Sequence, residues 1–134
     1  MRLHRDAKAE LIRSVPLFAD CSPDEVAEVA AIADEIDLRA GKDLTTESTD
    51  GREFVVMVEG SAEVTQGGSV INTLGPGDWF GEIALLTGKP RTATVRATST
   101  VHALVIEGHR FTQLLEHAPD IRAKVERVFA QRSE

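Results

Sequence analysis

Residues 75–95 read GPGDWFGEIALLTGKPRTATV, and they interrupt an otherwise regular pattern of short β-strands. The glycines and proline of residues 75–77 predict the end of a strand, and Gly88 and Pro90 predict the end of the short element that precedes them. Between them, residues 82–86 suit one or two helical turns. A short helix between two strands exposes unpaired backbone N–H groups at its start, and such groups favour an anion.

Two charged side chains in this stretch, Glu82 and Arg91, suit a ligand that carries both hydroxyl groups and a phosphate. An arginine is always charged and offers two parallel N–H donors that match phosphate geometry. Gly81 has no Cβ, so a ligand can approach its backbone closely. From the residues alone two interpretations stay open: a phosphate site, or a structural Glu–Arg ion pair beside ordinary glycine turns.

On both sides of this stretch the apolar pattern has the period of β-strands. Residues 54–58 place apolar side chains on both faces of one strand. Gly67-Gly68 predicts a two-residue hairpin turn between strands near residues 62–64 and 70–71. Residues 92–106 predict two further strands. Short strands with glycine turns at this frequency indicate a sandwich or barrel.

Helical patterns occupy both ends of the chain. A first helix is expected before Pro16, and residues 22–25 (SPDE) form a capping box that predicts a second, continuing to about Ala33. Helical spacing returns at His109, and a last helix is expected over residues 120–131. We therefore expect an α+β fold in a single domain over residues 1–134. It would comprise N-terminal helices in residues 1–34, an antiparallel, jelly-roll-like β-roll in residues 35–107 and C-terminal helices in residues 108–134.

Composition narrows the possible functions. The net charge of -7 argues against direct nucleic-acid binding, which needs a basic face, and means that local groups must hold any anionic ligand. Cys21 is the only cysteine, and no apolar run approaches the roughly 20 residues of a membrane span, so we expect a soluble, cytoplasmic domain without a transmembrane segment. We interpret Cys21 as structural, and the acidic run at residues 34–37 as solvated surface.

Metal and enzyme chemistry find little support. No pair of the four histidines has zinc-ligand spacing with a third partner, and the predicted strands carry only His102, whereas a β-roll metalloenzyme would need clustered His and Glu ligands. No Ser or Cys nucleophile has a recognisable base. We expect no metal, no cofactor and no catalysis, and we expect Trp79 to pack in the core and not on a base.

Residues 80–95, FGEIALLTGKPRTATV, resemble the phosphate-binding cassette of the cyclic-nucleotide-binding domain family, here taken as residues 79–95. That family includes kinase regulatory subunits, gated channels and bacterial catabolite-activator-type regulators. Residues 15–18, 53–64 and 75–80 resemble other parts of the same pattern. The pair Glu47-Ser48 departs from it, because the family usually has glycine at the second position.

The resemblance implies a role for each matching residue. Glu82 would accept a hydrogen bond from the ribose 2′-hydroxyl, assisted by the Gly81 amide, and Arg91 would pair with the exocyclic phosphate oxygen. Amides of the short helix and the next strand would reach the phosphate, and apolar side chains would wall the nucleotide. The full set of implied ligand residues is Gly81, Glu82, Ile83, Ala84, Arg91, Thr92, Ala93, Val64 and Ile71.

The expected function is a regulatory sensor that binds cyclic AMP or cyclic GMP and signals through the last helix. The Thr92 hydroxyl could bond the guanine 2-amino group, yet bacterial cyclic-AMP regulators also carry Ser or Thr there, and we favour cyclic AMP. The apolar stripe Val125, Val128 and Phe129 is either core or a lid over the base. The effector is unknown; a helix starting near Met1 favours a stand-alone, bacterial-type module over a piece of a larger protein. The alternative function is a protein-interaction domain of the same fold without nucleotide.

Overall fold

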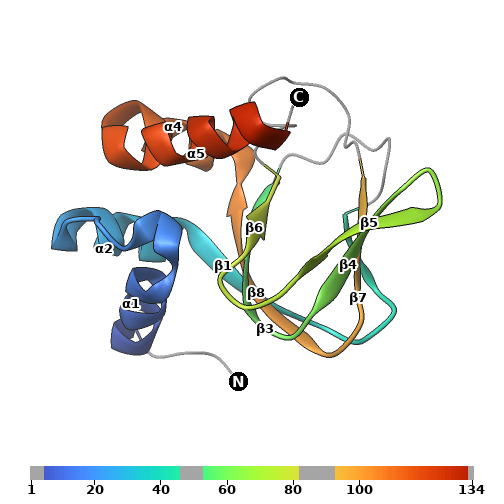
Figure 1. The fold of residues 1–134 in the computed structure, drawn as a ribbon. Coiled ribbons are helices and arrows are strands. Elements are labelled where there is room, and N and C mark those ends of the chain that lie inside the picture. The colour runs from blue at the N-terminus through green and yellow to red at the C-terminus, as the bar shows by residue number, and fades with distance from the viewer. Residues whose placement is uncertain (1–4, 46–52, 82–92, 133–134) are drawn as a thin grey trace.

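The computed structural model describes residues 5–45, 53–81 and 93–132 of the chain. Its strands form two four-stranded antiparallel sheets, with the orders β1-β8-β3-β6 and β2-β7-β4-β5. These sheets face each other as the walls of a roll (Figure 1). The strand bounds are β1 (Ala33–Leu38), β2 (Asp43–Thr45), β3 (Glu53–Glu59), β4 (Ala62–Gln66), β5 (Ser69–Leu74), β6 (Trp79–Phe80), β7 (Thr94–Ala97) and β8 (Val101–Glu107).

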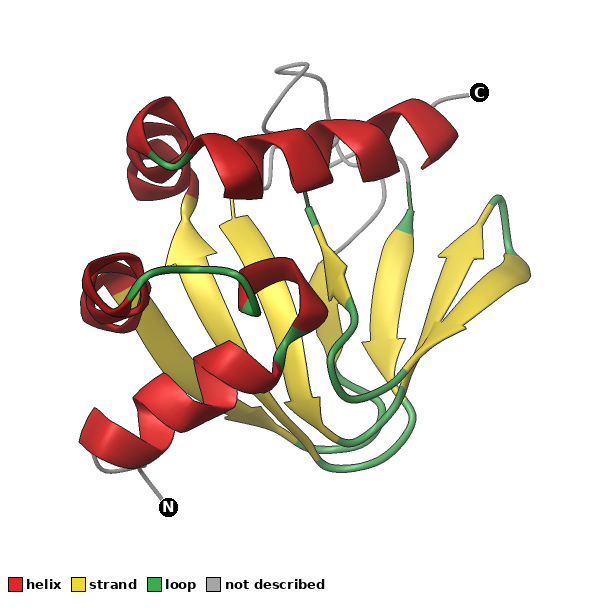
Figure 2. Cartoon of the chain, turned by 60° about the vertical axis from the view of Figure 1, so that its left-hand side comes forward, coloured by secondary structure: helices red, strands yellow, loops and turns green. Residues whose placement is uncertain are grey.

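Helices from both ends of the chain pack on one side of the roll. The N-terminal helices are α1 (Arg5–Ser14), the 3-10 helix η1 (Pro16–Phe18) and α2 (Pro23–Ile32); the C-terminal helices are α4 (Gly108–His117) and α5 (Pro119–Arg132). Figure 2 shows α5 lying across one end of the strands. The prediction of an antiparallel β-roll flanked by helices is confirmed.

The capping box predicted for α2 is present. The Glu25 backbone N–H donates to Ser22 Oγ at 3.2 Å, and the Ser22 N–H donates to Glu25 Oε1 at 2.8 Å. Both groups are backbone donors that the helix itself cannot satisfy. This helix therefore begins where local chemistry alone places it.

Strand β3 contributes side chains to two hydrophobic cores, one on each face. Phe54 and Val56 lie in the core beneath the helices, whereas Val55 and Met57 lie in the core between the two sheets. Phe54 stacks on Phe111 of α4, with ring centroids 4.1 Å apart, and so joins the sheet to the C-terminal helices. Apolar residues on both faces of residues 54–58 predicted this arrangement correctly.

The β4–β5 hairpin closes through Gly67 and Gly68, whose φ angles are 60° and 83°. Two consecutive positive φ values are typical of the tight turn that the glycine pair predicts. The hairpin projects from the side of the roll away from α1 and α2 (Figure 1).

Two local predictions near β1 are wrong. Helix α2 ends at Ile32, so Ala33 begins the strand and does not continue the helix. The acidic run is also not wholly solvated, because Glu35 is only 7% exposed. Alternation along a strand puts Glu35 on the same face as the core residue Ala33, where Glu35 Oε1 lies 3.1 Å from His102 Nε2.

Candidate ligand-binding site

Some of the predicted ligand residues lie in the part of the chain that the structure describes, and others lie outside it. Glu82, Ile83, Ala84, Arg91 and Thr92, as well as the variant pair Glu47-Ser48, lie outside the described residues. The described ends of the cassette are Gly81, directly after β6, and Ala93, directly before β7. Because β6 and β7 belong to different sheets, residues 82–92 connect one wall of the roll to the other.

A hydrogen-bonded turn fixes the N-terminal side of this connection. The Gly77 N–H donates to Met57 O and the Met57 N–H donates to Asp78 O, both at 2.8 Å. The Asp78 carboxylate accepts the Gly75 N–H, also at 2.8 Å. These bonds hold the turn before β6 on the central strand β3, so the backbone that enters the cassette is anchored in the roll.

The strand that follows the turn places its two aromatic residues in different cores. Phe80 is 7% exposed in the core between the sheets, and Trp79 packs against the core beneath the helices, as predicted. Gly81 then adopts a φ of 107°, a conformation that side chains rarely take. The chain thus leaves β6 at a residue without a Cβ, in a conformation that favours glycine.

On the C-terminal side, β7 lies between β2 and β4 and carries alternating roles. Val95 is 3% exposed in the core between the sheets. The next residue, Arg96, points outward, and its Nε donates to Asp43 Oδ1 at 2.8 Å. This hydrogen bond, with the charge of Asp43, raises the pKa of Arg96 above its ordinary value. The Arg96 side chain therefore links β7 to β2 through Asp43.

The two apolar side chains predicted to wall the ligand occupy neighbouring strands. Val64 of β4 is opposite Val95 of β7 and Asn72 of β5, and it packs partly against the core between the sheets. Ile71 of β5 lies beside a register irregularity and is 57% exposed. The structure therefore brings Val64 close to the end of β7 that carries Ala93, and leaves Ile71 at the open edge.

Asn72 is a residue that sequence reasoning missed. Cross-strand partners point to the same face of a sheet, so Asn72 shares the inner face with Val64. Its position there depends on the irregularity between Val64 and Thr65, which shifts the strand register. The extra residue of this irregularity is Ile71, and neither hydrophobic alternation nor turn residues reveal it in advance.

Helix α5 is already packed on the protein in this structure. Val125 is 0% exposed and belongs to the core beneath the helices, together with Ile121. Lys124 Nζ lies 2.9 Å from Asp20 Oδ2 and donates to Pro16 O at 3.3 Å, which ties the helix to the chain around η1. The side chains of Val128 and Phe129 lie outside what the structure describes.

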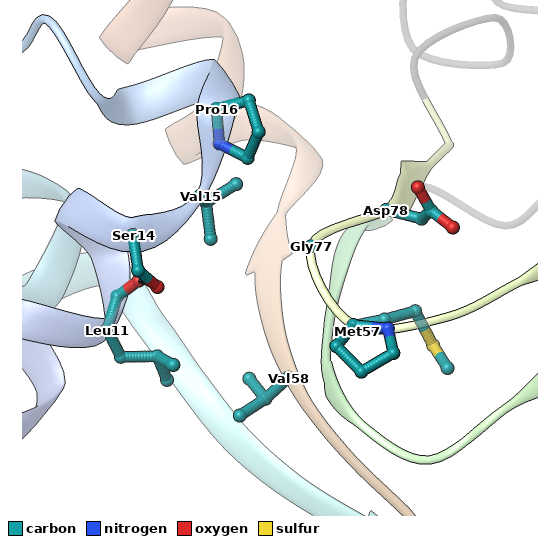
Figure 3. Close-up of a pocket in the computed structure, with 9 residues that line it drawn as sticks. Leu11, Ser14, Val15, Pro16, Met57, Val58, Gly77 and Asp78 are labelled. Atoms are coloured by element: carbon teal, nitrogen blue, oxygen red, sulfur yellow. Dashed lines mark hydrogen bonds between the residues drawn. The ribbon is translucent and has the colours of Figure 1, made fainter.

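A surface pocket of about 360 Å³ lies elsewhere, between the α1–η1 segment and the turn before β6 (Figure 3). Leu11 and Val58 extend into it from opposite sides. Asp78 is the one charged residue among those that line it, so the pocket is unsuited to a phosphate. Its lining residues are Leu11, Ser14, Val15, Pro16, Met57, Val58, Pro76, Gly77 and Asp78.

Other candidate chemistries have little support among the described residues. Burial, reinforced by the negative charge of Glu25, raises the pKa of the Cys21 thiol to about 11, so Cys21 stays protonated near neutral pH. Within the described ranges no group of three or more His, Cys, Asp or Glu side chains could hold a metal ion. None of the helices in those ranges is long and apolar enough to cross a membrane.

Most of the sequence that forms the two sheets matches the model of a known protein family. The family model described as "Cyclic nucleotide-binding domain" matches residues 35–118, which begin within β1 and include β2 to β8 and α4. The chain belongs to the cyclic nucleotide-binding domain family. The family resemblance seen in residues 80–95 is thereby confirmed.

Known members of different types resemble this cyclic nucleotide-binding domain. A cyclic nucleotide-gated potassium channel of Mesorhizobium japonicum is 35% identical over 112 residues, covering 84% of this chain and 31% of the channel. A solved structure described as cAMP-bound PfPKA-R (141-441) superposes with a TM-score of 0.82 at 26% identity, covering 96% of this chain and 47% of that one. The chain spans less than a third of the length of the curated relatives it matches.

The fold alone does not determine the ligand. The regulatory subunit of a cAMP-independent protein kinase A from Trypanosoma brucei superposes with a TM-score of 0.86, covering 92% of this chain and 45% of that one. Its sequence is only 18% identical, so this likeness concerns the fold. The identity of the ligand therefore needs evidence beyond the fold.

Proposed function

We propose that this domain binds cyclic AMP reversibly and acts as a regulatory sensor without catalysis of its own. The observation that carries the proposal is the family match over residues 35–118, within which the sequence keeps both Glu82 and Arg91. In this proposal residues 1–134 work as one domain in the cytoplasm. Its effector is another protein or domain, and no nucleic acid binds directly.

Charge explains why the cassette must supply its own cation. The chain carries a net charge of -7, so its overall field repels a cyclic phosphate. Arg96, the described cation nearest to the cassette in sequence, is engaged by Asp43. We assign the phosphate to Arg91, with the backbone amides of Ala84 and Ala93 as further donors and Thr92 as an additional hydroxyl partner.

The ribose and the base need different contacts. Glu82, with the Gly81 amide, would hold the ribose 2′-hydroxyl, and Val64, Ile71 and Ile83 would line the apolar wall. The outer face of the base remains exposed to solvent unless another segment covers it. We assign that role to α5, where Val128 and Phe129 follow the buried Val125.

Cyclic AMP is favoured over cyclic GMP because the relative with the cAMP-bound structure is 26% identical across nearly the whole chain. A calorimetric titration of the purified protein with both nucleotides tests this choice. We expect cyclic AMP to bind more tightly. Cyclic GMP binding tenfold more tightly would overturn the choice of base while leaving the cassette assignment intact.

The same titration separates the sensor from a protein-interaction domain of the same fold. A sensor binds at least one cyclic nucleotide, and 2′-deoxy cyclic AMP should bind more weakly because it lacks the hydroxyl that Glu82 accepts. A hydrogen bond to a charged group contributes about 1.5–3 kcal/mol, or roughly 10- to 150-fold in affinity. Absence of binding to either nucleotide would favour the interaction domain.

A further inference from the structure

The two sheets end in four edge strands, β1, β6, β2 and β5, among the strands described. An edge strand exposes unpaired N–H and C=O groups that can pair with another chain, and proteins usually blunt it with charges or short length. Strand β1 carries Asp34, Glu35 and Asp37. Strand β2 has three residues including Asp43, and β6 has only two residues.

Strand β5 lacks these protections. It runs for six residues, Ser69–Leu74, without a charged residue or a proline. Val70 and Ile71, 55% and 57% exposed, are the large hydrophobic side chains exposed in the described part of the chain. Two features blunt it: the register irregularity beside Ile71, which shortens the length that can pair continuously, and the Thr73 N–H, which already donates to Asn72 Oδ1 at 2.8 Å.

The charge pattern points to a second copy of the same chain as the occupant. Two copies that each carry -7 repel one another wherever acidic surfaces meet. Residues 64–77 contain no Asp, Glu, Lys or Arg and form the longest such stretch in the chain, so β5 lies in the region where this repulsion is weakest. A charged partner would find no complementary group on this strand.

We propose that β5 is a self-association edge, on which two copies pair antiparallel about a twofold axis. The same strand then serves both partners, so the contact closes as a dimer and does not propagate. The hairpin projects away from the N-terminal helices (Figure 1), and residues 69–73 of β5 are exposed. A contact of one short strand is small, so the dimer is weak and forms only at high protein concentration.

Sedimentation velocity over a concentration series up to about 1 mM, without nucleotide, measures this association. The test variant is Val70→Lys, which places a charge on the edge strand β5. Within the hairpin, Val70 pairs with Thr65 of β4. Gln113→Lys on α4 is the matched control, because it changes the net charge equally at another exposed position. Unchanged thermal melting of both variants shows that they fold.

We expect wild type and Gln113→Lys to dimerise alike and Val70→Lys to shift the association at least tenfold toward monomer. Thr73→Lys, on the same strand, should act as Val70→Lys does. Hydrogen exchange of residues 69–74 should slow as concentration rises. A wild-type chain that stays monomeric, or a dimer that both β5 variants leave unchanged, would overturn the proposal. Protection that appears on another edge would overturn it as well.

Discussion

Arg91 and Arg96 lie close in sequence, yet we assign them opposite roles. Arg96 is exposed and bonded to Asp43 on the outer face of β7, whereas Arg91 is proposed to hold the ligand phosphate. At the scale of residues, this pair gives a matched comparison. Each substitution removes the same guanidinium and the same charge, so a difference between them reports position and not net charge.

Arg91→Ala is expected to weaken cyclic AMP binding strongly, while Arg96→Ala should bind within about threefold of wild type. Removing one partner of a buried charge pair costs about 2–5 kcal/mol, or roughly 30- to 4,000-fold in affinity. Isothermal titration of the three proteins measures the difference. Equal losses in both variants would mean that Arg91 acts only through the general charge of the domain.

Gly60 predicts a second residue-scale effect, this time on stability. A Cβ at Gly60 would lie 2.2 Å from Thr100 O, and its φ is 94°. Gly41 has a similar φ of 90°, but a Cβ there would meet no described atom within 4 Å beyond its chain neighbours. Gly41→Ala should therefore show only backbone strain, about 1–2 kcal/mol, and Gly60→Ala a clear addition of about 1–3 kcal/mol from overpacking.

Urea denaturation of the two variants gives this comparison directly. Both glycines lie in turns between strands, so the unfolded-state effect of adding a methyl group should be similar in each. A Gly60→Ala protein as stable as Gly41→Ala would show that the chain around Thr100 shifts at little cost.

At the scale of elements, the features that depend only on adjacent residues were predicted correctly from the sequence. The capping box of α2 and the glycine turn of β4–β5 depend on adjacent residues, and both are where the sequence places them. Glu35 shows the limit, because its burial depends on a distant strand that supplies His102. The bulge that sets Asn72 opposite Val64 is likewise a property of strand pairing. For the site, the cassette could be recognised from the sequence, whereas the strands β6 and β7 that anchor its two ends in different sheets became clear only from the structure.

The structure limits how α5 can act as a lid. Ile121 and Val125 are buried in the core and Lys124 contacts Asp20, so the first part of the helix is held in place. Any movement on ligand binding should therefore concentrate after Val125, where Val128 and Phe129 follow. Cyclic AMP should slow hydrogen exchange in residues 126–131 beyond the general stabilisation that ligand binding produces.

Truncation provides the complementary measurement for α5. Removing residues 128–134 deletes Val128 and Phe129 but keeps Val125 and Lys124. If one apolar side chain covers the base, affinity should fall by roughly 10- to 150-fold, because its burial contributes about 1.5–3 kcal/mol. An unchanged affinity together with unchanged exchange would show that the helix is not the lid.

At the scale of the whole molecule, two cores share one sheet. The core beneath the helices and the core between the sheets are separated by β1, β8, β3 and β6. Strand β8 follows the same rule as β3, with Leu104 and Ile106 on the helix side and Ala103 and Val105 on the other. The cassette is attached to this shared sheet through β6, and α4 through β8.

Such a shared wall has a thermodynamic consequence. Neither core can melt while the other survives intact, because each would lose one of its two sides. The helices from both chain ends and the sheet β2-β7-β4-β5 should therefore unfold together with the shared sheet, as a single cooperative unit. A nucleotide bound at the proposed site would then protect α1 and α2 from unfolding too. In a cell, the occupied domain would resist proteolysis along its whole length, and the lifetime of the protein would itself report the nucleotide level.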